Sequence, residues 1–126
     1  MTAPLTESPL VALELSGRLD ATTAGAVGEA YARALDGIDG PVTLILDFTA
    51  VDYINSSGIA VVVGVLGRAR AAGHAVVALG LTPHYRHIFE ITRLSDFLTV
   101  AEDLATVADH APTRRVAVSP SGRSSS

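Results

Sequence analysis

The pattern of hydrophobic and polar positions predicts strands that alternate with helices along the chain. Val42 to Phe48 is a nearly unbroken apolar run rich in β-branched residues, which is typical of a strand buried on both faces. Alternation from Val11 to Leu15 predicts a half-buried strand before it. His74 to Leu79 predicts another buried strand, and Phe97 to Val100 a last short one.

Four segments between and after these strands carry helical signals. Apolar residues recur at helical spacing from Thr22 to Asp36, and Ile59 to Ala72 is apolar, proline-free and closed by Gly73. Shorter helices are predicted from Pro83 to about Glu90 and from Ala101 to His110. Strand–helix alternation requires right-handed crossovers. We therefore predict an α/β fold: a four- to five-stranded, mostly parallel sheet with about four helices packed on it.

Periodicity fades at both ends of the chain. Residues 1–9 are polar and predict a flexible N-terminus, and residues 10–110 predict one domain. Residues 111–126 contain proline, arginine, serine and glycine without periodicity, which predicts a disordered tail.

The junction between the central strand and its helix, Asn55 to Gly58, is the most informative stretch. A helix start offers unpaired backbone N–H groups and the positive end of the helix dipole, so it tolerates a phosphate. Two interpretations remain open here. Ser56 or Ser57 caps the helix, or one of the two is chemically modified or acts as a nucleophile.

The helix after this junction lacks the charges of a solvated face. At about 100° per residue, one side is the expected core face, formed by Ile59, Val62, Val63 and Leu66. The opposite side is small and apolar and carries Ala60, Val61, Gly64, Val65 and Arg68. This predicts either a partner-binding surface or a surface that another helix or the tail covers.

Composition excludes several classes of site. Cysteine is absent, so no disulfide or thiolate ligand can form, and the absence of lysine removes both a P-loop lysine and the lysine of a phosphoaspartate receiver. All thirteen acids but only six of the nine arginines fall within residues 1–110, and an acidic body argues against nucleic acid. With no membrane-spanning run and no signal peptide, we expect a cytoplasmic protein without a membrane partner.

An enzyme or a metal protein finds little support in the sequence. Ile54 occupies the place of the first glycine in a G-x-S-x-G nucleophile motif, and no histidine is close to the serines in sequence. His84 and His87 have the spacing to share a metal, but no third ligand is indicated. We expect no catalytic residue, no metal and no cofactor.

Three segments in order resemble the STAS domains of anti-sigma factor antagonists. Asp47 to Ile59 resembles their phosphorylation loop, an apolar strand followed by Asp-Ser-Ser/Thr-Gly-Leu at a helix start. Gly17-Arg18-Leu19-Asp20 resembles their early Gly-x-Leu-Asp. The segment from Leu81-Thr82-Pro83 through Ile88-Phe89 to Leu94 resembles their later helix. The resemblance covers about Val11 to His110 and implies the STAS fold.

The resemblance also implies a mechanism. Unphosphorylated antagonists bind an anti-sigma factor that is also a serine kinase and so free a sigma factor. The kinase phosphorylates the first serine, here Ser56, a serine phosphatase reverses this, and the antagonist catalyses nothing. The resemblance implies Asp20, Asn55, Ser57 and Gly58 as residues of the loop. The small apolar face of the following helix adds Val61, Gly64, Val65 and Arg68 as expected partner-binding residues.

This chain departs from the family pattern in two places. Asn55 replaces the family's acid and removes one negative charge beside the phosphoacceptor. We also expect the short N-terminus to shorten or remove the family's first strand. Two alternatives remain. One is a STAS scaffold module in a signalling assembly that is never phosphorylated, and the other is a small serine-dependent enzyme.

Overall fold

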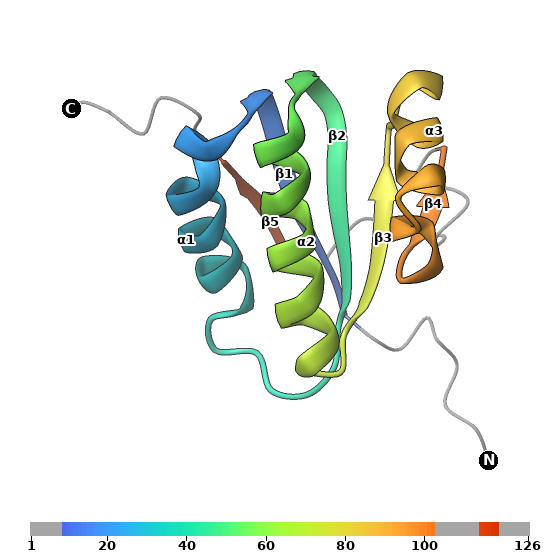
Figure 1. Ribbon diagram of the computed structural model, residues 1–126. Coiled ribbons are helices and arrows are strands. Elements are labelled where there is room, and N and C mark those ends of the chain that lie inside the picture. Colours follow the sequence, from blue (N-terminus) through green and yellow to red (C-terminus); the bar gives the residue numbers. More distant parts are fainter. Residues whose placement is uncertain (1–8, 103–113, 119–126) are drawn as a thin grey trace.

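A computed structural model describes residues 9–102 and 114–118 (Figure 1). Its elements in chain order are β1 (Leu10–Leu19), the 3-10 turn η2 (Ala21–Thr23), α1 (Ala24–Leu35), β2 (Thr43–Ile54), α2 (Ser56–Ala71), β3 (Ala75–Leu79), α3 (Pro83–Ile91), the 3-10 turn η3 (Leu94–Asp96), β4 (Thr99–Ala101) and β5 (Arg114–Ala117). No helix in the described ranges is long and apolar enough to cross a bilayer.

The five strands form one sheet in the order β4-β3-β2-β1-β5, and every pairing between them is parallel. Helices α1 and α2 run side by side along one face of this sheet, and α3 lies toward the β3–β4 edge (Figure 1). The predicted α/β class and parallel sheet are confirmed. The described residues form three α-helices, because the fourth predicted helix falls largely in residues 103–110, outside the described ranges.

Alternating side chains of the inner strands enter two separate cores. On β2, Leu44 and Leu46 belong to the large core under α1 and α2, whereas Ile45 belongs to a smaller core with Leu10 and Val77. Because successive strand residues point to opposite faces, the smaller core lies on the other side of the sheet. All three β2 side chains are at most 1% exposed, which confirms the prediction of a strand buried on both faces.

Strand β2 is longer than its apolar run predicts. It continues through Ile54 instead of ending at Phe48, and Leu19 of β1 still pairs with Ile54. The Ile54 N–H donates to the hydroxyl of Tyr85 on α3 at 2.9 Å. The polar and exposed residues of this half of β2 hid the strand from the hydropathy pattern. As a result, the strand leads directly into α2.

The prediction of a disordered tail is wrong for residues 114–118. Strand β5 pairs with β1 from Val11↔Arg114 to Glu14↔Ala117, and Val118 is only 4% exposed, within the large core. A four-residue edge strand buries too few side chains to produce a recognisable period. Residues 111–113 and 119–126 lie outside the described ranges, as does the predicted flexible segment up to residue 8.

The predicted core face of α2 is also partly wrong. Val65, placed on the outer face, is 5% exposed, whereas Val63, placed in the core, is 46% exposed. The buried residues of α2 are Gly58, Val62, Val65, Leu66 and Ala69. Helix α2 is apolar on nearly every side, so hydropathy alone could not show that α1 would cover the flank carrying Val65.

Candidate functional site

The site is built where β1 and β2 end and α2 begins. Asn55 is the N-cap of α2 in an extended conformation (φ −98°, ψ −173°), and its Oδ1 accepts a hydrogen bond from the Gly58 N–H at 2.9 Å. Its carbonyl oxygen accepts from the Ile59 N–H, also at 2.9 Å. The interpretation that Ser56 or Ser57 caps the helix is therefore wrong. The side-chain amide oxygen of Asn55 performs the capping instead.

With the cap supplied by Asn55, the two serine hydroxyls are left at the surface. Ser56 and Ser57 are the first two residues of α2, and both are exposed. Within residues 9–102 and 114–118, no hydrogen bond involves either hydroxyl. Their own N–H groups belong to the first turn, where no carbonyl of the helix can reach them. This combination favours a negatively charged group on either oxygen.

Gly58 lets the end of β1 approach α2 closely. A β-carbon on Gly58 would overlap the carbonyl oxygen of Leu19 and would lie 2.9 Å from Cγ2 of Ile54. That same Leu19 oxygen accepts a hydrogen bond from the Asn55 N–H at 3.3 Å. The structure thus brings Asp20, the residue after Leu19, next to the Asn55–Gly58 loop.

Asp20 is held in place by its own turn. Its carboxylate accepts from the Thr22 hydroxyl and, at 2.9 Å, from the Thr22 N–H, while its N–H donates to Oγ1 of Thr23 at 3.1 Å. The bond from the Thr22 hydroxyl is the main cause that lowers the pKa of Asp20, and the charge of Arg18 lowers it further. The guanidinium carbon of Arg18 lies 4.8 Å from the ring centroid of Tyr53. The loop therefore has a fixed carboxylate at its side.

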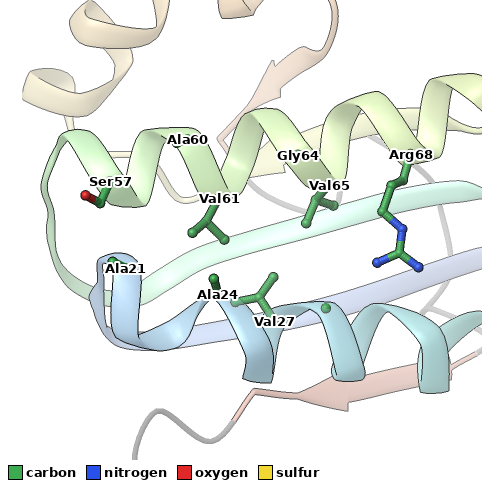
Figure 2. A pocket seen from close by; sticks show the side chains of 10 residues that line it. Ala21, Ala24, Val27, Ser57, Ala60, Val61, Gly64, Val65 and Arg68 are labelled. Atoms are coloured by element: carbon green, nitrogen blue, oxygen red, sulfur yellow. The ribbon is translucent and has the colours of Figure 1, made fainter.

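A groove of about 520 Å³ lies between η2 and the first half of α1 on one side and α2 on the other (Figure 2). Ser57 is at one end, and the side chain of Arg68 reaches toward α1 at the other end. Between them the walls consist of alanine, glycine and valine residues from both helices. The guanidinium carbon of Arg68 lies 4.4 Å from the ring centroid of the buried Tyr31.

The structure brings most of the expected partner-binding residues to this groove. Val61, Gly64 and Arg68 line it together with Ser57, and Val65 contributes from its buried position between the helices. Ser56 is not among the lining residues. The contribution of α1 was missed, because only tertiary packing brings that helix beside α2. The alanines and glycines of both segments are the one signal in the sequence that anticipates so close an approach.

The described histidines are engaged away from the serines. His74 Nδ1 accepts from the Val42 N–H at 3.0 Å, the His84 ring packs against Tyr85 with centroids 4.9 Å apart, and His87 lies 4.0 Å from Glu90. In the part of the chain that the structure describes, no group of three or more metal-ligating side chains comes together. None of the contacts that these three histidines make involves Ser56 or Ser57.

Sequence comparison decides the family. The protein-family model described as Mlab, STAS domain, matches residues 6–101 of this chain. This chain belongs to the STAS domain family. The anti-sigma-B factor antagonists of Listeria monocytogenes and Listeria innocua are each 35% identical over 88 residues, covering 68% of this chain and 74% of theirs. The putative anti-sigma factor antagonist BtrV of Bordetella bronchiseptica is 32% identical over 101 residues, covering 75% of this chain and 87% of its own.

Solved structures of STAS proteins share the fold. The anti-sigma factor antagonist SpoIIAA in its unphosphorylated form gives a TM-score of 0.52 at 18% identity, with 85% of this chain and 89% of that chain covered. A STAS domain protein from Planctomyces limnophilus gives 0.59 at 16% identity, with 71% and 76% covered. The expected STAS fold is confirmed. The sequence relatives are named as anti-sigma factor antagonists, in agreement with the expectation that this chain catalyses no reaction.

Proposed function

We propose that this STAS protein is an anti-sigma factor antagonist switched by phosphorylation of Ser56. Unphosphorylated, it binds an anti-sigma factor with serine kinase activity in the cytoplasm and so releases a sigma factor. Phosphate on Ser56 ends this binding, and a serine phosphatase restores it. The Listeria relatives named as anti-sigma-B factor antagonists support the role. The observation that supports modification at this place is the pair of exposed serines at the start of a helix that Asn55 already caps. The choice of Ser56 over Ser57 rests on the resemblance, in which the first serine of the pair takes the phosphate.

The domain should tolerate this phosphate without refolding. A phosphoserine adds about −1.5 to −2 charges at pH 7. The unpaired N–H groups and the dipole of α2 stabilise such a charge by roughly 0.3–1 kcal/mol at an exposed position. A partner surface that fits a small neutral hydroxyl would instead have to bury the phosphate without a counter-charge, which costs several kcal/mol. The switch then acts on the interface and leaves the fold unchanged.

An acid at position 55 would both cap α2 and carry a negative charge. In this chain, two residues share these tasks. Asn55 keeps the capping bond but carries no charge. Asp20 supplies a carboxylate beside the loop, and its lowered pKa keeps it ionised at neutral pH. A basic group of the kinase can pair with it. We therefore expect Asn55 to slow phosphorylation without preventing it.

Mass spectrometry after incubation with ATP tests the proposal directly. The chain is incubated with each purified anti-sigma factor kinase of its own organism, and phosphopeptides over residues 53–68 are mapped. Ser56→Ala should bind a kinase and resist phosphorylation, whereas Ser57→Ala should remain a substrate. Asn55→Asp should raise the phosphorylation rate by restoring the acid. Phosphate on Ser57 alone would refute the assignment of Ser56.

One observation favours a second candidate, a STAS scaffold module that acts by contact alone. The family's acid is absent at Asn55, and with it one charge that a kinase could recognise. Stable binding of a partner together with no phosphate on either serine would establish this alternative.

A further inference from the structure

The two serines lie on different sides of α2. At about 100° per residue, Ser56 shares an exposed stripe with Val63 and Arg70, whereas Ser57 shares a stripe with Gly64 and Arg68. Only the second stripe faces α1 and lines the groove (Figure 2). The proposed phosphorylation site and the groove are therefore neighbouring but separate features of one surface.

The groove selects for apolar groups along most of its length. Its walls include Ala24, Ala60 and Gly64, which are exposed and have at most a β-carbon to project. Val61 and Val65 point from α2 toward α1 across the same space (Figure 2). Such walls leave room for an occupant's larger side chains and offer them little hydrogen bonding. Burying those side chains would contribute about 25 cal/mol per Å² of apolar surface.

Among the residues that the structure describes, Arg68 is the single charged one that lines this groove. Its guanidinium lies on the face of Tyr31, with the carbon 4.4 Å from the ring centroid, and a β-carbon on Gly28 would lie 3.8 Å from its Nη1. No ion pair within residues 9–102 and 114–118 uses Arg68. A stacked guanidinium is already oriented, so it loses less freedom when a carboxylate binds to it through two parallel hydrogen bonds.

We propose that the groove receives an apolar segment of the anti-sigma factor, and that a carboxylate on this segment pairs with Arg68. The inference rests on the proposed function and adds the chemistry of the partner. Arg68 follows Ser57 by three turns of helix, roughly 16 Å at 1.5 Å per residue. The partner's acid must therefore lie about that far from the part of the segment that reaches Ser57. Charge complementarity favours a segment with an acidic residue, since a basic or uncharged segment would leave the guanidinium without a counter-charge.

Calorimetric titration of the full chain with each purified anti-sigma factor of its own organism tests this. Arg68→Ala should weaken binding by at least about tenfold, and Arg68→Glu by more than about a hundredfold, because a close charge pair is lost or reversed. Arg68→Lys should fall between wild type and Arg68→Ala, because it keeps the charge and loses the paired bonds. A partner variant with one acid changed to arginine should restore binding to Arg68→Glu.

Arg70→Ala is the matched control. Arg70 lies on the same helix, is exposed, and stacks over Phe97 on the side away from the groove, at 5.1 Å from the ring centroid. We expect this variant to bind within about twofold of wild type. Thermal melts of all variants must agree to within a few degrees, so that a loss of binding reports on the surface.

The outcomes separate this inference from the proposed function. If no anti-sigma factor binds the wild-type chain, the proposed function fails, and the inference with it. If one binds, and Arg68→Ala matches Arg70→Ala, the function stands and the groove is not the docking site. Two further experiments test other occupants of the groove, one with sodium decanoate and one with the chain alone. NMR shifts in the groove with decanoate, with partner affinity independent of Arg68, would assign the groove to a small amphiphile. A dimer that Arg68→Ala dissociates would assign it to a second copy.

Discussion

At the scale of single residues, the site depends on one position where two backbone segments pack closely and on one side chain that caps the unpaired N–H groups of a helix. Gly58 is the point where α2 approaches the end of β1, and Asn55 closes the first turn of α2. Sequence alone marked both positions, because a turn-type residue before a helix and a glycine inside its first turn are local signals. What the sequence could not decide was whether Asn55 or a serine is the cap. That depends on which side chain turns back toward the Gly58 N–H.

Gly58→Ala should destabilise the domain by about 1–3 kcal/mol through overpacking. The new β-carbon meets the backbone of Leu19, which cannot move without losing its bond from the Asn55 N–H. Gly67→Ala is the control on the same helix. It is exposed with no neighbour within 4 Å, so it should stabilise by roughly 0.4–1 kcal/mol. Urea denaturation measures both, and a Gly58→Ala variant as stable as wild type would contradict the close approach.

Asn55→Ala should cost about 1 kcal/mol, the usual effect of losing an N-cap. Asn55→Asp should keep the cap and gain from the helix dipole. Both interactions favour the carboxylate, so they hold its folded-state pKa below the unfolded value. The gain is therefore complete above the unfolded pKa and is lost as pH falls through the folded pKa. Urea midpoints from pH 7 to pH 3 test this, and equal losses of stability for Asp and Asn over that range would contradict it.

At the scale of elements, the sequence predicted those whose pattern is local and missed those that depend on a neighbour. The sequence predicted the buried strands and the helix that follows Thr82. In the structure, the Thr82 side chain accepts a hydrogen bond from the Tyr85 N–H, and Pro83 begins α3 as predicted. Strand β5 was missed because its evidence is tertiary. The Arg114 guanidinium donates to the carbonyl oxygens of Arg33, Ala34 and Asp36 at 3.0, 3.0 and 2.8 Å. One arginine from a distant segment thus satisfies the open C-terminus of α1.

Arg114→Ala should lower the free energy of unfolding by about 1.5–3 kcal/mol, the range for hydrogen bonds to a charged group. Arg115→Ala is the matched control on the neighbouring residue. Its ion pair with Glu14 has a 3.0 Å separation but joins side chains that are 49% and 37% exposed, so its loss should cost less than about 1 kcal/mol. The two urea curves decide, and equal midpoints would show that β5 does not hold α1.

At the scale of the whole molecule, the fold separates a buried face of α2 from an exposed one, and the proposed docking of a partner depends on where that boundary lies. The sequence of α2 has two opposite faces of similar hydropathy, so the pattern alone does not identify the face that packs in the core. Burial resolves this: Val65 is 5% exposed, whereas Ala60 is exposed and lines the groove. A charge placed at Val65 would therefore test the fold, and a charge placed at Ala60 would test the partner surface.

Ala60→Glu should keep the fold and weaken binding of the anti-sigma factor by more than about tenfold, because the complex would bury an unpaired carboxylate. Val65→Glu should unfold the domain or lower its melting temperature by many degrees, since that carboxylate would enter the core even without a partner. Thr99→Glu adds the same charge at an exposed position on β4, at the far edge of the sheet, and should change neither property. Circular dichroism melts establish folding, and titration with the anti-sigma factor then measures affinity. If Ala60→Glu and Thr99→Glu bind equally well, the exposed face of α2 makes no contact with the partner, and the docking surface must lie elsewhere around Ser56.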